Sequence, residues 1–118
     1  MSSIVLMNDQ REWLGFLLIA DYASLSKGGE SDFIFTGVPS NPSLFETPEC
    51  EMILDHKHIE YRAKNKGTKN AISFEVQIEP SITFTLALEK TGTGTWTFKN
   101  SDGSVLQGKC EMAAKTRQ

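Results

Sequence analysis

The sequence predicts an α+β domain that is dominated by antiparallel β-structure. Apolar and polar residues alternate along most of the second half of the chain, and turn residues separate the runs. In one stretch near the N-terminus, apolar residues recur at helical spacing instead. We therefore expect a six-strand antiparallel meander over about 50–112, curled on one N-terminal helix over about 10–26, as an open sheet or a partly closed barrel. An all-β sandwich or barrel is the alternative.

Length and composition predict a single domain over residues 1–118. A chain of 118 residues can bury a core without disulfide or metal crosslinks, and 39% hydrophobic with 23% charged residues is a globular composition. No apolar run approaches the roughly 18 residues that span a bilayer. The N-terminal segment also lacks the basic and small-residue features of a signal peptide. We therefore expect a cytoplasmic protein with no membrane partner.

The apolar stretch near the N-terminus has the features of a helix. Asp9 and Glu12 have the spacing of a capping box, with Asp in place of Ser or Thr. Apolar side chains recur at helical spacing over 13–25, and two glycines follow as a stop signal. These features predict the helix. A buried strand over 13–22 is the alternative, because the stretch contains a glycine and a tyrosine.

Two strands and one long loop are expected around this stretch. A short strand over 4–7 precedes it, and a strand over 32–37 follows it. Three prolines then mark a loop over 38–49. At about a dozen residues this loop is long for a compact domain, and loops of that length often carry function.

Cross-strand pairing predicts the first hairpin of the meander. A two-residue turn at 56–57 would set Leu54 opposite Ile59 and Met52 opposite Tyr61 on one apolar face. The reverse face would then carry complementary charges. This arrangement predicts a strand from residue 50 up to the turn.

The next hairpin has the strongest pattern. A turn at 79–81 sets Phe74 opposite Leu86 and Val76 opposite Phe84, while polar residues pair on the reverse face. A one-residue slip would destroy this match. The pattern therefore predicts both the strands and their register.

Two further turns, each containing a glycine, extend the meander. They set Leu86 opposite Phe98 and Trp96 opposite Gly108, where the indole ring would cover exposed backbone. We therefore expect one face of the sheet to bury a set of large side chains. The set is Phe74, Val76, Phe84, Leu86, Trp96 and Phe98.

No pattern of catalytic or metal-binding residues emerges. Cys50 and Cys110 are too few for a structural zinc site, and we expect both to be buried, reduced thiols. His56 and His58 lack a convincing third ligand, so we expect no metal and no cofactor. No serine lies in the Gly-x-Ser-x-Gly frame of a nucleophile elbow. We therefore expect a protein that is not an enzyme and has no catalytic residues.

Charge is unevenly distributed along the chain. Residues 1–60 hold ten acidic and three basic side chains, whereas residues 61–118 hold five acidic and nine basic ones. One short segment, 62–69, carries four of the basic residues and no aromatic residue that could stack on a base. A mildly acidic chain with one such segment is not expected to bind nucleic acid.

The acidic N-terminal half and the long loop predict a surface for a protein partner. Leu44 and Phe45 would be apolar anchors if exposed, and Glu46, Glu49 and Glu51 would form a charged rim around them. We therefore expect a non-enzymatic binding protein of the immunity, inhibitor or adaptor type, with a basic protein as its partner. The alternative is a binder of a small apolar ligand in a cavity between curled sheet and helix.

Overall fold

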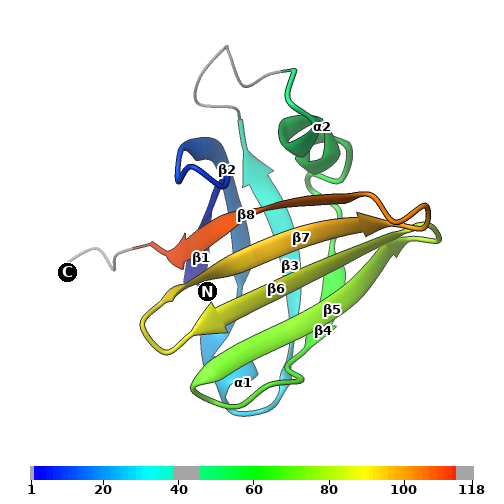
Figure 1. The fold of residues 1–118 in the computed structure, drawn as a ribbon. Helices are drawn as coiled ribbons and strands as arrows, with labels where there is room; N and C mark the ends of the chain where they lie inside the picture. The colour runs from blue at the N-terminus through cyan, green and yellow to red at the C-terminus, as the bar shows by residue number, and fades with distance from the viewer. Residues whose placement is uncertain (1, 39–45, 114–118) are drawn as a thin grey trace.

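The sheet curls into a nearly closed barrel in which all paired strands are antiparallel. The computed structural model describes residues 2–38 and 46–113. In chain order its elements are β1 Ser2–Met7, β2 Trp13–Ala20, α1 Tyr22–Ser26, β3 Glu30–Gly37, α2 Pro48–Asp55, β4 Tyr61–Lys64, β5 Ala71–Glu79, β6 Ile82–Glu89, β7 Thr93–Asn100 and β8 Val105–Met112. The strand order is β4-β3-β2-β1-β8-β7-β6-β5, with β1 paired to β8 (Figure 1). The predicted β-dominated antiparallel domain with a partly closed barrel is confirmed.

The barrel remains incompletely closed between β4 and β5. Near their connection, the Lys66 backbone N–H donates to the Ser73 carbonyl oxygen at 2.7 Å. The Asn65 side-chain oxygen accepts from the Ser73 backbone N–H at 3.1 Å, and its amide nitrogen donates to the Leu25 carbonyl oxygen at 2.8 Å. Asn65 therefore joins the two strands to α1, at one end of the barrel only.

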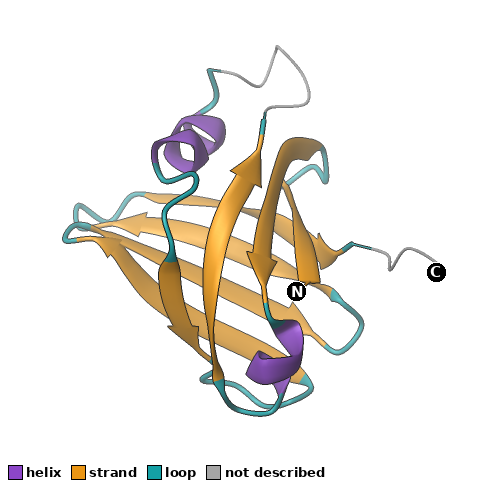
Figure 2. Cartoon of the chain, turned by 180° about the vertical axis from the view of Figure 1, so that it is seen from behind, coloured by secondary structure: helices purple, strands orange, loops and turns teal. Residues whose placement is uncertain are grey.

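Connections alternate between two ends of the barrel because successive strands run in opposite directions. The α2 end contains the β1–β2 connection, the β3–β4 connection with α2, and the β5–β6 and β7–β8 turns. The α1 end contains the β2–β3 connection with α1, and the β4–β5 and β6–β7 connections. Figures 1 and 2 show the two helices at these opposite ends.

Aromatic side chains fill the barrel interior. Rings that lie next to one another in this cluster have their centroids 5.1 to 6.1 Å apart. Burial of each such side chain contributes about 1.5–3 kcal/mol to folding. The clustered rings, each at most 1% exposed, are those of Phe33, Phe35, Phe74, Phe84, Trp96 and Phe98.

The predicted helix over 10–26 is wrong, and the alternative strand is right. Residues 13–20 form β2, which pairs with β1 on one side and β3 on the other. Its even-numbered side chains, Leu14, Phe16, Leu18 and Ala20, are buried, whereas Leu17 and Ile19 are half-buried on the outer wall. Gly15 has φ 93°, a conformation that a helix excludes. Pairing on both edges overrides the helical spacing, and only α1 remains helical here.

The capping-box pattern belongs to a turn rather than to a helix start. The side-chain oxygen of Asn8 accepts from the backbone N–H of Gln10 at 3.0 Å and of Glu12 at 2.9 Å. The Asn8 amide also donates to the Glu12 carboxylate at 2.9 Å. Asn8 therefore shapes the β1–β2 connection, and polar turn residues of this kind mimic a helix start in the sequence.

The strand predicted from residue 50 to the turn at 56–57 is also wrong. This segment is α2, so residues 50–112 contain five strands and a helix. The Thr47 side chain caps the helix by accepting from the Cys50 backbone N–H, and Pro48 occupies its first turn. Leu54 and Ile59 consequently are not strand partners, and Tyr61 pairs with Phe33 instead. α2, not an N-terminal helix, covers one end of the barrel.

The predicted registers of the later hairpins are largely confirmed. Phe74 lies opposite Leu86, and Val76 lies opposite Phe84. Trp96 lies opposite Gly108, as expected. The β6–β7 register is two residues off, because Leu86 pairs with Trp96 rather than with Phe98. A two-residue slip keeps each side chain on its face, so the expected set is inward, with Val76 only half-buried.

Candidate partner-binding surface

At the α2 end of the barrel, one side of α2 is buried and the other is exposed. Cys50 and Ile53 are fully buried beneath the helix, whereas Glu51, Leu54 and Asp55 are exposed on its outer side. Glu49 and Glu51 lie in the first turn, where carboxylates interact favourably with the helix dipole. The helix thus presents an acidic outer side over an apolar inner side.

His56 ties the end of α2 to β5. Its side chain is 5% exposed, with Nδ1 2.8 Å from the Met52 carbonyl oxygen and Nε2 2.6 Å from Glu79 Oε2. The carbonyl oxygen can only accept, so Nδ1 donates to it. Burial raises the pKa of Tyr61, and the nearby Glu79 carboxylate raises it further. His56 is therefore a structural tie between helix and sheet.

Lys57 makes a second tie, to β3. Its ammonium donates to the Gly37 carbonyl oxygen at 2.7 Å. Its backbone also forms an isolated β-bridge with the backbone of Phe35. His58 follows with φ 65° and an exposed side chain, so the two histidines point to different surroundings. Within 2–38 and 46–113, no three His, Cys, Asp or Glu residues gather as they would around a metal ion.

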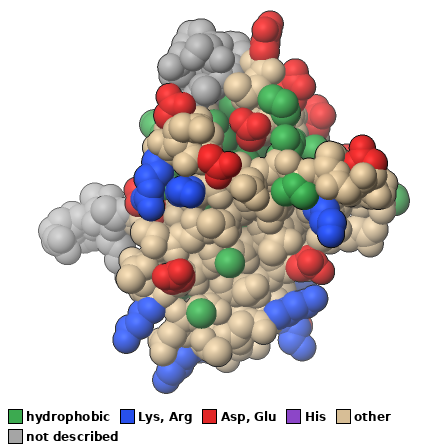
Figure 3. Space-filling model, in the orientation of Figure 1, with side chains coloured by type: hydrophobic (Ala, Val, Ile, Leu, Met, Phe, Trp, Pro, Cys, Tyr) green, Lys and Arg blue, Asp and Glu red, His purple; other side chains and the backbone are tan. Residues whose placement is uncertain are grey.

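Acidic side chains concentrate at the α2 end. The connections and helix at this end carry eight acidic residues against two basic ones, and one of the two is the bonded Lys57. Figure 3 shows acidic side chains gathered around α2 at the top of the view. The eight are Asp9, Glu12, Glu46, Glu49, Glu51, Asp55, Glu60 and Asp102.

Large hydrophobic side chains are exposed at the same end. All five that stand out as exposed among the described residues lie in or beside its connections. Leu54 is on α2 and Ile59 follows it, with 41% and 47% of their surfaces exposed. The other three are Trp13, Val38 and Val105. Exposed apolar groups within an acidic surround are an arrangement typical of protein interfaces.

The residues expected to bind a partner fall partly on this surface. Glu46 and Glu51 are exposed, and Glu49 is half-buried. Leu44 and Phe45 lie outside the described residues. Sequence reasoning missed Leu54 and Ile59 because it placed them inside a hairpin. It also missed that the acidic residues share one end of the barrel, although strand alternation would have revealed this once the strands were counted correctly.

Neither cysteine has the surroundings of a nucleophile. Cys50 and Cys110 are both unpaired and buried, as predicted. Burial, the larger cause, and the neighbouring Glu111 carboxylate raise the pKa of the Cys110 thiol to about 12. A thiol with so high a pKa is almost entirely protonated near neutral pH, and the thiolate is the reactive form.

None of the helices in the described part of the chain is long and apolar enough to cross a membrane. Comparison of the chain with known protein families, with curated proteins and with solved structures finds no match.

Proposed function

We propose that the protein is a non-enzymatic, cytoplasmic protein-binding domain, of the immunity, inhibitor or adaptor type, that occupies a basic partner with its α2 end. The observation that carries this proposal is the coincidence of eight acidic residues with the exposed large hydrophobics at one end of the barrel. Two buried, unpaired cysteines fit a reducing compartment.

The two kinds of side chain have separate roles in this proposal. Leu54 and Ile59 would lose their solvent-exposed surface against the partner and supply most of the binding energy. The carboxylates around them would attract a basic surface and speed its approach, an effect that salt screens. The ties through His56 and Lys57 hold α2 in place, so little conformational freedom would be lost on binding.

The alternative function, a small apolar ligand inside the barrel, has less support. Aromatic rings occupy the interior at contact distances. A hollow of about 330 Å³ lies on the outer wall of β5–β7 instead, and its lining, with Glu75, Thr83, Thr85 and Lys99, is polar. Such a lining does not suit an apolar ligand.

The test compares two charge reversals of equal size at opposite ends. Glu51→Lys with Asp55→Lys alters the α2 end, and Glu89→Lys with Glu111→Lys alters exposed carboxylates near the α1 end. The partner is captured from the native host at low salt, then produced separately for kinetic measurements. We expect the first pair to slow association about tenfold or more, and the second to leave it nearly unchanged. Equal effects of the two pairs would contradict the proposal.

A second comparison tests the apolar groups. Leu54→Ser with Ile59→Ser should speed dissociation from the partner, because these side chains would be buried in the complex. Ala87→Ser, at an exposed position on the outer wall of β6, is the control and should change neither rate. Unchanged dissociation in the Leu54 and Ile59 variant would exclude the α2 end as the interface.

A further inference from the structure

The α1 end carries the opposite charge from the α2 end. Five lysines, all exposed, lie in its connections or at the adjoining strand end. None of the five ammonium groups forms an ion pair within the part of the chain that the structure describes. Figure 3 shows Lys and Arg side chains on both sides near the bottom of the view, with others higher up at the left and right. The five are Lys27, Lys64, Lys66, Lys69 and Lys90.

These lysines form one continuous surface because the connections that carry them touch. Asn65 bonds to the Leu25 and Gly29 carbonyl oxygens, which brings the β4–β5 loop against the α1–β3 turn. Ala71 pairs with Glu89, which sets the same loop beside the β6–β7 turn. The surface therefore runs from Lys27 through the β4–β5 loop to Lys90.

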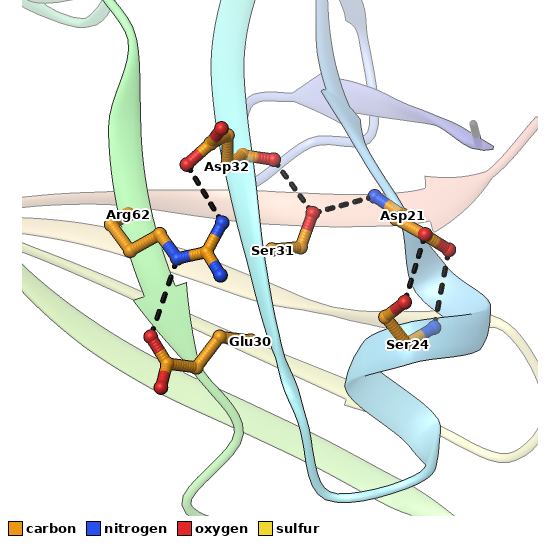
Figure 4. Close-up of polar contacts among 6 residues, drawn as sticks. All are labelled: Asp21, Ser24, Glu30, Ser31, Asp32 and Arg62. Atoms are coloured by element: carbon orange, nitrogen blue, oxygen red, sulfur yellow. Dashed lines mark hydrogen bonds and ion pairs between the residues drawn. The ribbon is translucent and has the colours of Figure 1, made fainter.

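The acidic residues near this surface are mostly engaged elsewhere. Arg62 lies between Glu30 and Asp32 and forms ion pairs of 3.2 and 3.0 Å with them (Figure 4). The Asp21 carboxylate accepts from the backbone N–H and the hydroxyl of Ser24 as the cap of α1. Glu89, next to Lys90, and Glu111 are exposed carboxylates near this end, and neither forms an ion pair within the described residues. Five unpaired lysines therefore face two unpaired exposed carboxylates, which leaves this end with a positive excess.

Distance keeps the acidic end from cancelling this positive field. The molecule measures 37 × 36 × 24 Å along its principal axes. The Debye length at physiological ionic strength is about 8 Å. Charges at opposite ends are therefore separated by several Debye lengths, and an approaching anion at the α1 end senses mainly the lysines.

We infer that the α1 end is a docking surface for an anionic lipid membrane, which leaves the α2 end pointing away from the bilayer. The arrangement of the lysines suits a membrane surface. Their ammonium groups lie at the tips of adjacent connections, where a flat array of anionic headgroups can reach them together. The features of other polyanion sites are missing. None of the exposed large hydrophobics of the described residues lies here to anchor an acidic protein, and no exposed aromatic residue of these connections can stack on a base.

This inference departs from the expectation that the protein has no membrane partner. That expectation rested on the lack of an apolar stretch long enough to span a bilayer. Electrostatic attachment through lysines requires no such stretch. It is also independent of the proposed function, since the two surfaces lie at opposite ends.

The test is vesicle cosedimentation with the whole protein at low and high salt. The vesicles are phosphatidylcholine alone, and phosphatidylcholine with about a quarter phosphatidylserine. We expect binding to the anionic vesicles only, lost at high salt. Since each lysine near an anionic surface contributes about fivefold, Lys69→Ala with Lys90→Ala should weaken binding by about 25-fold. Lys99→Ala with Lys109→Ala removes equal charge from the outer walls of β7 and β8 and should change it little.

Three results would overturn the inference. The first is no binding to anionic vesicles at low salt. The second is equal weakening by the two lysine pairs, which would mean a general charge effect. The third is tighter binding to a single-stranded oligonucleotide or to polyglutamate than to the vesicles, since either would identify a different class of partner. Charge reversal at the α2 end should leave vesicle binding intact, so this test and that of the proposed function can fail separately.

Discussion

Gly108 on β8 lies directly opposite Trp96 on β7, and the indole ring covers its backbone. A Cβ added to Gly108 would lie 2.6 Å from Trp96 Cζ2 and would also collide with the Met7 carbonyl oxygen. The indole N–H donates to that same carbonyl oxygen and to that of Lys109, each at 3.0 Å. One glycine therefore allows the ring to close the contact between β1, β7 and β8.

The first prediction concerns this contact. Gly108→Ala should lower the free energy of unfolding by about 1–3 kcal/mol, because the added methyl displaces a fully buried ring. Urea denaturation followed by tryptophan fluorescence measures this. Gln107→Ala, at the neighbouring exposed position, should change stability by less than about 0.5 kcal/mol. Equal stability of the two variants would show that the ring can move aside.

The second prediction concerns the aromatic cluster. Phe84 is fully buried and contacts the rings of Phe33, Phe35 and Phe98. Phe84→Ala should therefore cost about 3–5 kcal/mol of stability. Thr85→Ala, on the outer wall, is the matched control and should cost little. Denaturant unfolding of both variants measures the difference, and a loss below about 1 kcal/mol for Phe84→Ala would contradict the packing.

The third prediction concerns the tie between α2 and β5. Glu79→Gln should destabilise the protein by about 1–3 kcal/mol, since it removes the charged partner of a buried ring nitrogen. Amide hydrogen exchange should increase mainly in α2. Glu75→Gln, which removes an exposed carboxylate from the same strand, should do neither. In a double-mutant cycle with His56→Gln, additive effects would mean that the two side chains do not interact.

The fourth prediction concerns Asp21 and acid. The bond from the Ser24 backbone N–H, and then that from its hydroxyl, lower the pKa of Asp21 below the usual 3.8 (Figure 4). A lowered folded-state pKa adds stability that is present above the unfolded pKa and lost as pH falls through the folded one. In an NMR titration, Ser24→Ala should raise the Asp21 midpoint part of the way back, because the backbone bond remains. Ser26→Ala should leave it unchanged, and an unchanged midpoint in Ser24→Ala would contradict the role of the hydroxyl.

The sequence by itself determined the parts of the fold that depend on local alternation. Phe74, Val76, Phe84 and Leu86 alternate with polar residues at period two, and a slip by one would bury the polar set. The Trp96–Gly108 pair followed from the same arithmetic. Burial of Cys50 and Cys110 was also predicted, because unpaired cysteines are among the residues most often buried.

Only the tertiary structure decided the rest, because long-range contacts outweighed local preference there. Residues 13–20 have helical spacing, yet β1 and β3 lie on both sides and make them a strand. Leu54 and Ile59 matched a hairpin, yet the Thr47 cap and the buried tie of His56 to Glu79 hold the segment as α2. Counted along the chain, the acidic and basic residues separate into an N-terminal and a C-terminal half. In the structure they separate between the two ends of the barrel instead, because successive connections lie at alternate ends. That sorting is invisible until every strand is placed, because one misassigned strand reverses the end at which all later connections lie.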